Sequence, residues 1–215
     1  MHINPNFNMN ELCDEVINSS LAKTIEKYHN GAMVMLELPV ENYVVANSSS
    51  VKFLTENGFE GIYVSFQRPF ENIKCLFEEY GIDKDKVTVL DYASFFCEND
   101  NADQKNCVDI SSMDFKIIAK AIADSLEKID CKNKFVLIDS LSTVALYKDG
   151  SEVEELAKNL IGINDDNLLI LLNIAEDLVK KQYVKDITSY ADEVINLLSC
   201  VEKYSRDVVG PHVLT

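Results

Sequence analysis

The sequence has little arginine and a large excess of acidic side chains. Only Arg68 and Arg206 are arginines, so no guanidinium cluster is available for bidentate recognition of phosphate. Thirty-six acidic residues against 20 basic ones give a formal charge of -16 at pH 7. Such a charge repels nucleic acid and anionic lipid, so we expect neither as a partner.

Long hydrophobic runs are also missing. No apolar segment approaches the roughly 20 residues that a membrane-spanning helix needs. The N-terminus is polar and rich in asparagine, unlike a secretory signal, which has a basic segment followed by an apolar one. We therefore expect a cytoplasmic protein without a membrane partner.

The cysteines show no spacing typical of a metal site. The sequence contains six of them, without a C-x-x-C motif or a nearby pair of histidines: Cys13, Cys75, Cys97, Cys107, Cys131 and Cys200. We predict free and mostly buried thiols and no metal centre. Cys97 and Cys107 share an irregular segment, which makes them the pair to test for redox behaviour.

Motifs for catalysis are absent as well. No G-x-x-x-x-G-K-[ST] phosphate loop and no G-x-S-x-G nucleophile elbow occurs. His2, His29 and His212 lie far apart in the chain, and no cysteine and histidine pair suggests acyl transfer. We predict no catalytic residue, which favours a protein that is not an enzyme.

What the sequence does contain is a regular alternation of strand and helix patterns. Its 215 residues with 47% hydrophobic content suit one α/β domain. We predict a flexible arm over 1–9, a single domain over 10–200, and a tail or edge segment over 201–215. The connection 92–110 is unusually long and polar, which predicts a mobile segment or a contact surface.

Six apolar runs predict strands, and helical patterns separate most of them. The predicted strands are 32–38, 61–66, 86–91, 135–139, 167–173 and 193–198, with the last one in the centre of the sheet. The predicted helices are 12–28, 39–56, 70–80, 111–129 and 151–162. This order predicts a doubly wound, mostly parallel sheet of about six strands with helices on both faces.

Ligands of doubly wound sheets lie beyond the carboxyl ends of the strands. After the first strand stand Pro39, Glu41 and Asn42, without a glycine to expose amides or a lysine to meet phosphate. Glu41 would instead place a carboxylate near the phosphate position. This turn is therefore predicted to be a poor phosphate site.

The second strand is followed by Gln67 and Arg68. An amide beside a guanidinium cannot accept a proton from water, so this pair cannot act as a general base. Arg68 could bind an anion, although an ion pair with Glu71 or Asp91 is the favoured interpretation.

The strand at 135–139 ends on Asp139, followed by Ser140. One carboxylate makes a poor magnesium site, because the ion normally lies between carboxylates and substrate phosphates. Asp139 would therefore hold magnesium only together with a bound nucleotide. Its alternative role is structural, accepting hydrogen bonds from the region of Ser140, Ser142 or Thr143.

These blocks together resemble the RecA-like ATPases of the KaiC type. The matching segments are 61–66, 87–91, 136–142, 168–173 and 190–197, within a likeness that covers roughly residues 12 to 200. The resemblance implies the fold of RecA-like P-loop NTPases and a cytosolic, archaeal setting. In that family a Walker A loop follows the first strand and paired glutamates follow the second, whereas only Asp139 matches the Walker B aspartate here. The resemblance thus indicates a vestigial nucleotide site at Pro39, Glu41, Asn42, Gln67, Arg68, Asp139 and Ser140.

Three functions remain open. The first is a catalytically inactive RecA/KaiC-like domain without a cofactor, acting as an interaction or regulatory module with a protein partner or in a homo-oligomer. The second is a nucleotide-binding domain or weak ATPase, with Asp139 on magnesium and a lysine such as Lys52 or one from a neighbouring subunit on phosphate. The third is a small-molecule sensor for an uncharged or cationic ligand.

Overall fold

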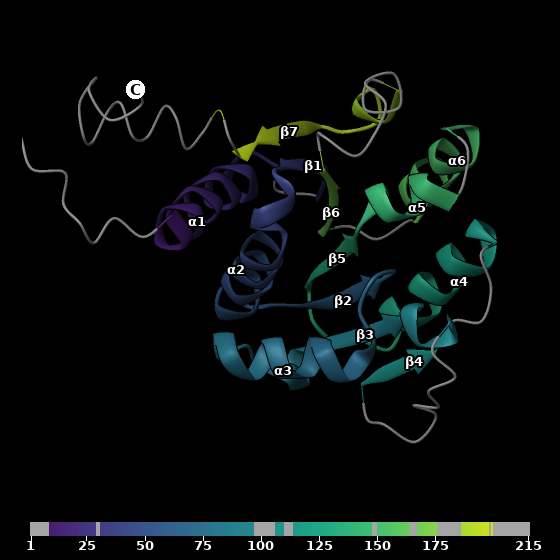
Figure 1. The fold of residues 1–215 in the computed structure, drawn as a ribbon, viewed down its shortest axis with the longest axis horizontal. Coiled ribbons are helices and arrows are strands. Elements are labelled where there is room, and N and C mark those ends of the chain that lie inside the picture. Colours follow the sequence, from purple (N-terminus) through teal and green to yellow (C-terminus); the bar gives the residue numbers. More distant parts are fainter. Residues whose placement is uncertain are drawn as a thin grey trace, which may run out of the picture.

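Strands and helices alternate along the chain in a computed structural model (Figure 1). The structure describes residues 9–28, 31–96, 106–109, 114–147, 150–163, 167–175, 186–197 and 199. The strands are β1 (Ala32–Leu38), β2 (Phe59–Ser65), β3 (Val87–Asp91), β4 (Cys107–Asp109), β5 (Asn133–Asp139), β6 (Leu168–Ala175) and β7 (Glu193–Asn196). The α-helices are α1 (Met9–Lys27), α2 (Tyr43–Glu56), α3 (Phe70–Tyr80), α4 (Phe115–Leu126), α5 (Leu141–Tyr147) and α6 (Gly150–Ile161).

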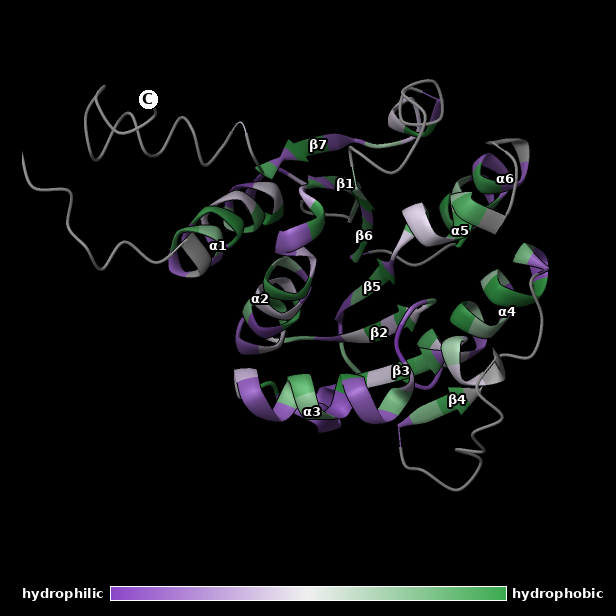
Figure 2. Ribbon diagram, viewed as in Figure 1, coloured by the Kyte–Doolittle hydropathy of each residue, from purple (hydrophilic) through white to green (hydrophobic). Residues whose placement is uncertain are grey.

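All seven described strands form one parallel sheet in the order β4-β3-β2-β5-β6-β1-β7. Helices α1, α2 and α3 cover one face, and α4, α5 and α6 cover the other (Figure 1). Every residue of β6 is buried, as expected of a strand that has helices on both sides. In Figure 2, α1 and α3 carry both hydrophilic and hydrophobic residues, which is typical of helices with one face in solvent.

The α/β class, the parallel sheet and the helices on both faces confirm the predicted fold class, with seven strands in place of about six. The prediction missed β4, because a strand of only three residues gives no recognisable pattern. It also missed α5, which starts directly after the Asp139 strand. Residues 93–96 form a short 3-10 helix within the predicted long connection.

The predicted position of the last strand was wrong. Among the described strands β7 pairs with β1 alone and forms an edge of the sheet, whereas a central position was expected. Its residue Val194 is 37% exposed, which fits an edge strand. A short apolar segment does not by itself reveal its neighbours, because these are decided by the path of the whole chain.

Several predictions lie outside the described residues. They concern Cys97, the predicted helix start at residue 111, the tail 201–215 and residues 1–8 of the predicted arm 1–9, whose last residue, Met9, instead begins α1. None of the helices in the described part of the chain is long and apolar enough to cross a membrane. The cytoplasmic setting stays a prediction.

The connection from β1 to α2 determines what lies at the carboxyl edge of the sheet. Pro39 is extended, with φ -62° and ψ 144°, and a 3-10 turn over Val40–Asn42 leads into α2. The predicted start of a helix at Pro39 is therefore a tighter turn, and α2 begins at Tyr43. The chain reverses here without a glycine-rich loop.

Candidate functional site

A buried group of polar side chains lies between α2 and the sheet. Asp139 is the last residue of β5 and is fully buried. Tyr63 comes from β2 and Asn173 from β6, the two strands that flank β5. Asn47, from α2, covers them and is only 2% exposed. Because parallel strands place register partners on the same face, these three strand residues all point toward α2.

Three hydrogen bonds link the four side chains in series, and all of them run in the same donor-to-acceptor direction. The Nδ2 group of Asn173 donates to Oδ1 of Asn47. Asn47 Nδ2 donates to the Tyr63 hydroxyl at 3.2 Å, and Tyr63 Oη donates to Asp139 Oδ2 at 2.5 Å. The chain thus runs from β6 through α2 and β2 to the carboxylate on β5.

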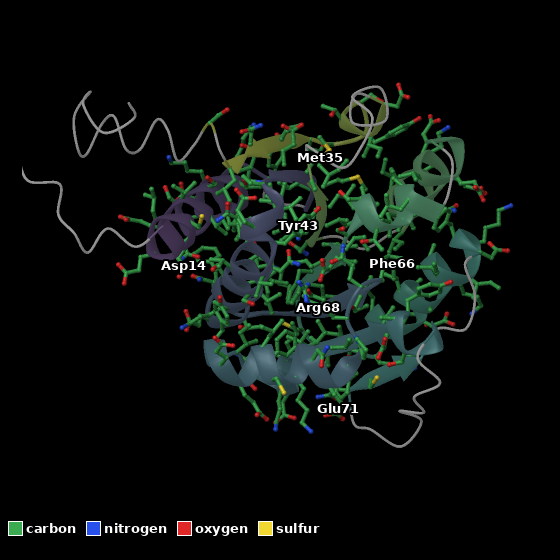
Figure 3. All side chains as sticks on the ribbon, in the orientation of Figure 1. Asp14, Met35, Tyr43, Phe66, Arg68 and Glu71 are labelled. Carbon is green, nitrogen blue, oxygen red and sulfur yellow. The ribbon has the colours of Figure 1, made fainter. Side chains whose placement is uncertain are left out.

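Arg68 reaches the same carboxylate from the loop after β2. Its Nη1 lies 3.2 Å from Asp139 Oδ2, and its side chain is 25% exposed. The favoured interpretation of an ion pair with Glu71 or Asp91 was wrong, because the loop directs the guanidinium inward. In Figure 3, Arg68 lies near the middle of the molecule and Glu71 near its margin. Asp91 instead accepts hydrogen bonds from the Phe70 amide, at 2.6 Å, and from Ser94.

Burial governs the protonation of this group. It raises the pKa of Asp139, while the hydrogen bond from Tyr63 and the charge of Arg68 lower it to a smaller extent. Burial also raises the pKa of Tyr63 well above its ordinary value, and the nearby Asp139 adds to this rise. Tyr63 therefore keeps its proton and remains a donor at neutral pH.

The residues after Asp139 bind other partners than expected. Gln67 Nε2 donates to Ser140 Oγ at 3.4 Å and also to the Thr143 hydroxyl. The hydroxyl oxygens Oγ of Ser140 and Oγ1 of Thr143 lie 3.3 Å apart. The Asp139–Ser140 peptide bond is cis. The expected hydrogen bonds from this region to Asp139 are replaced by those from Tyr63 and Arg68.

Ser142 links α5 to two other elements. Its Oγ accepts a hydrogen bond from the Ala175 amide at 2.6 Å and lies 3.1 Å from the Tyr43 hydroxyl. Tyr43 is the first residue of α2, and burial, the largest effect, raises its pKa. The start of α2 is thereby fastened to the segment that follows β5.

The turn between β1 and α2 does not present free amides at Asn42 and Tyr43. The Asn42 amide donates to the Pro39 carbonyl at 3.0 Å, and the Tyr43 amide donates to the Val40 carbonyl. The Asn42 side chain turns toward α1, where Nδ2 lies 3.3 Å from Cys13 Sγ. Glu41 is exposed, so its carboxylate does not fill the inside of the turn.

The predicted site residues thus fall into two groups. Gln67, Arg68, Asp139 and Ser140 come together around the end of β5. Pro39, Glu41 and Asn42 belong to the neighbouring turn. Among the described residues there is no group of three or more histidine, cysteine or acidic side chains that could hold a metal ion.

Comparisons with known proteins rest on structure alone, since no family model and no curated sequence matches the chain. One similar structure is that of PH0321, an uncharacterised protein of Pyrococcus horikoshii in complex with an unknown peptide. It is 12% identical in sequence and superimposes with a TM-score of 0.63. The match covers 83% of the present chain and 82% of PH0321. The KaiC-like protein PH0186 of the same organism is 17% identical, covers 78% and 71% respectively, and has a TM-score of 0.53. The chain has a RecA-like fold.

The RecA-like fold confirms the resemblance inferred from the strand blocks, at the level of architecture. Sequence analysis missed Tyr63, Asn47 and Asn173 as members of the buried group. A usable signal existed for Asn173, which is the one polar residue of the otherwise apolar and fully buried β6. Asn47 gave no such signal, since its burial depends on how α2 packs on the sheet.

Proposed function

We propose that this RecA-like domain does not hydrolyse ATP, requires no nucleotide cofactor and acts as a protein-interaction or regulatory module. The observation that carries the proposal is the pairing of Asp139 with Tyr63 and Arg68. Asp139 matches the position from which the resemblance derives magnesium binding, and its Oδ2 already receives two donors within the protein.

Magnesium would have to compete with these donors. The carboxylate is fully buried, and an ion bound there would have to displace the Tyr63 hydroxyl and the Arg68 guanidinium from Oδ2. Magnesium also keeps several oxygen ligands in near-octahedral geometry, commonly from phosphates and water. A single enclosed carboxylate supports this poorly.

The β1–α2 turn offers little to a triphosphate. Phosphate loops hold the ligand with free backbone amides and a lysine. Here the Asn42 and Tyr43 amides bind carbonyls of the turn itself, and the exposed Glu41 adds negative charge. These features weigh against both forms of the nucleotide-binding alternative.

Two observations support a protein partner. Val40, in the turn after β1, is 45% exposed, and Leu146, in the helix after β5, is 63% exposed. Exposed apolar side chains therefore lie in the segments that follow two strands at the carboxyl edge of the sheet. The PH0321 structure, which has the same architecture, contains an unknown peptide. A bound peptide or protein is thus compatible with this type of fold.

Isothermal titration with ATP, ADP and GTP in the presence of magnesium tests the proposal. We expect no binding at micromolar concentrations, either for the natural chain or for Asp139→Asn. Binding of any of these nucleotides at micromolar concentrations would overturn the proposal in favour of the nucleotide-binding function, and its loss in Asp139→Asn would show that Asp139 takes part.

Light scattering after size exclusion tests the interaction role. We expect the molar mass to be independent of ATP. If the segment after β5 takes part in a homo-oligomer, Leu146→Ser will lower the mass, whereas Ile117→Ser, an exposed apolar residue on α4, will not. A mass that rises only with ATP would contradict a nucleotide-independent module.

A further inference from the structure

Two buried oxygen atoms of the Asp139 group have no hydrogen-bond partner within the described part of the chain. They are Oδ1 of Asp139 and Oδ1 of Asn173. Both residues are 0% exposed. Leaving a buried acceptor unpaired is unfavourable, so two of them in one group require an explanation.

These two atoms belong to neighbouring positions of the sheet. β5 and β6 are parallel, and Ile138 is the register partner of Leu172, so Asp139 and Asn173 follow side by side. Both side chains point toward α2, on strands that lie about 4.8 Å apart. The hydrogen-bond chain therefore begins and ends at adjacent side chains.

The direction of the three hydrogen bonds shows that a donor to Asn173 Oδ1 is missing. Asn173 donates to Asn47, Asn47 to Tyr63, and Tyr63 to Asp139 Oδ2. We propose that Asp139 is a proton-binding site: a proton taken from solvent forms an O–H bond at Oδ1, which donates to Asn173 Oδ1 and closes a four-membered ring of side chains. In this ring each member donates one hydrogen bond and accepts one.

The ionised and the protonated carboxyl group have different partners. In the ionised state, Arg68 neutralises Asp139 across 3.2 Å. In the protonated state that attraction is lost, and the guanidinium, which is already 25% exposed, turns to solvent. Proton uptake at the base of the site is thus coupled to release of an arginine at its surface.

The groups around Asp139 are compatible with both the ionised and the protonated carboxyl group. From β2 and its loop come Tyr63 and Arg68, from α2 come Asn47 and Tyr43, and from β6 comes Asn173. Among these described groups only Arg68 carries a charge at neutral pH. Burial favours the neutral carboxyl group and Arg68 the ionised one, so the balance depends on pH.

This proton switch would control the charge of the carboxyl edge. Release of Arg68 makes its guanidinium available to a carboxylate or phosphate group of a partner. The inference goes beyond the interaction role and stands even if no partner docks at this edge. Titration of Asp139 without nucleotide tests it separately from the proposed function.

NMR of selectively ¹³Cγ-labelled aspartate measures the titration of Asp139 directly, with Asp139→Asn to assign its signal. We expect a midpoint above the value of about 3.9 for free aspartate. Arg68→Ala should raise the midpoint by about one pH unit, because it removes the opposing charge. Asn173→Ala should lower it, because the added proton loses its acceptor. Asn196→Ala, a β7 asparagine that binds Glu37, is the control and should leave it unchanged.

A second measurement follows Arg68 itself. Since the chain has only two arginines, the ¹⁵Nε signals of Arg68 and Arg206 are readily distinguished. We expect the Arg68 signal to gain mobility over the same pH range in which Asp139 takes up its proton. This measurement and Arg68→Ala test the proposal even if Asn173→Ala does not fold. An Asp139 midpoint at or below 3.9, or an Arg68 signal that does not respond, would overturn it.

Discussion

Tyr63 shows how one side chain can join elements that are far apart in the sequence. Its hydroxyl accepts from Asn47 on α2 and donates to Asp139 on β5. Sequence reasoning found Asp139, because an acidic residue at the end of an apolar strand is conspicuous. It did not find Tyr63, because a tyrosine is a common strand residue and its partners lie on other elements.

Tyr63→Phe removes this link while it preserves the ring. We expect a loss of about 1–3 kcal/mol in the free energy of unfolding, because Asn47 Nδ2 and Asp139 Oδ2 each lose a partner in a buried place. Urea denaturation at neutral pH measures the loss. Tyr80→Phe, at a half-buried tyrosine of α3, is the control and should change stability by less than about 0.5 kcal/mol. Equal effects of the two substitutions would contradict a special role for the Tyr63 hydroxyl.

At the scale of elements, close packing between β2 and β5 requires a glycine at position 61. Gly61 of β2 is the register partner of Phe135 on β5. A Cβ atom at position 61 would lie 2.3 Å from the Phe135 carbonyl oxygen and 2.5 Å from its ring. Glycine is therefore required here by the neighbouring strand, whereas Gly58 is favoured by its positive φ of 81°.

Gly61→Ala should consequently be much more harmful than Gly58→Ala. We expect a cost of about 3 kcal/mol or more at position 61, because the β2–β5 pairing must open to accommodate a methyl group. At position 58 no heavy atom lies within 4 Å, and the cost should be about 1–2 kcal/mol, from the backbone conformation alone. Thermal and urea unfolding of both variants provide the comparison. A smaller loss at position 61 would show that the strands can separate easily.

Helix α4 begins at Phe115, later than the predicted start at residue 111. The carboxylate of Asp114 accepts a hydrogen bond from the Lys116 amide at 2.8 Å, so this residue is the N-cap. Asp114→Ala should lower stability by about 1 kcal/mol. On the same helix, Asp124→Ala removes an exposed ion pair with Lys120 and should cost less than about 0.5 kcal/mol. If the two variants are equally stable in urea, the cap contributes nothing.

At the scale of the whole molecule, the order of the strands creates the buried group. β5 lies between β2 and β6, so residues 63, 139 and 173 meet although they are distant in the sequence. The formal charge of -16 is the other property of the entire chain. It affects which partners can approach, independently of the fold.

We expect this charge to prevent binding of nucleic acid. Electrophoretic mobility-shift assays with single- and double-stranded DNA and with RNA should show no complex, even at low salt, where phosphate contacts are strongest. A basic protein of similar size serves as the positive control. A complex that weakens as salt increases would reveal a local basic surface and contradict the expectation.

The sequence by itself determined the class of the fold, most of its strands and the acidic residue at the end of β5. These features depend on local patterns of apolar side chains and on turn residues, which a single chain displays directly. Only the tertiary structure decided that β7 lies at an edge, that Arg68 pairs with Asp139, and that Asn47, Tyr63 and Asn173 complete the buried group. The physical reason is that strand order and helix packing place distant residues in contact, and burial then makes their hydrogen bonds and charges depend on one another.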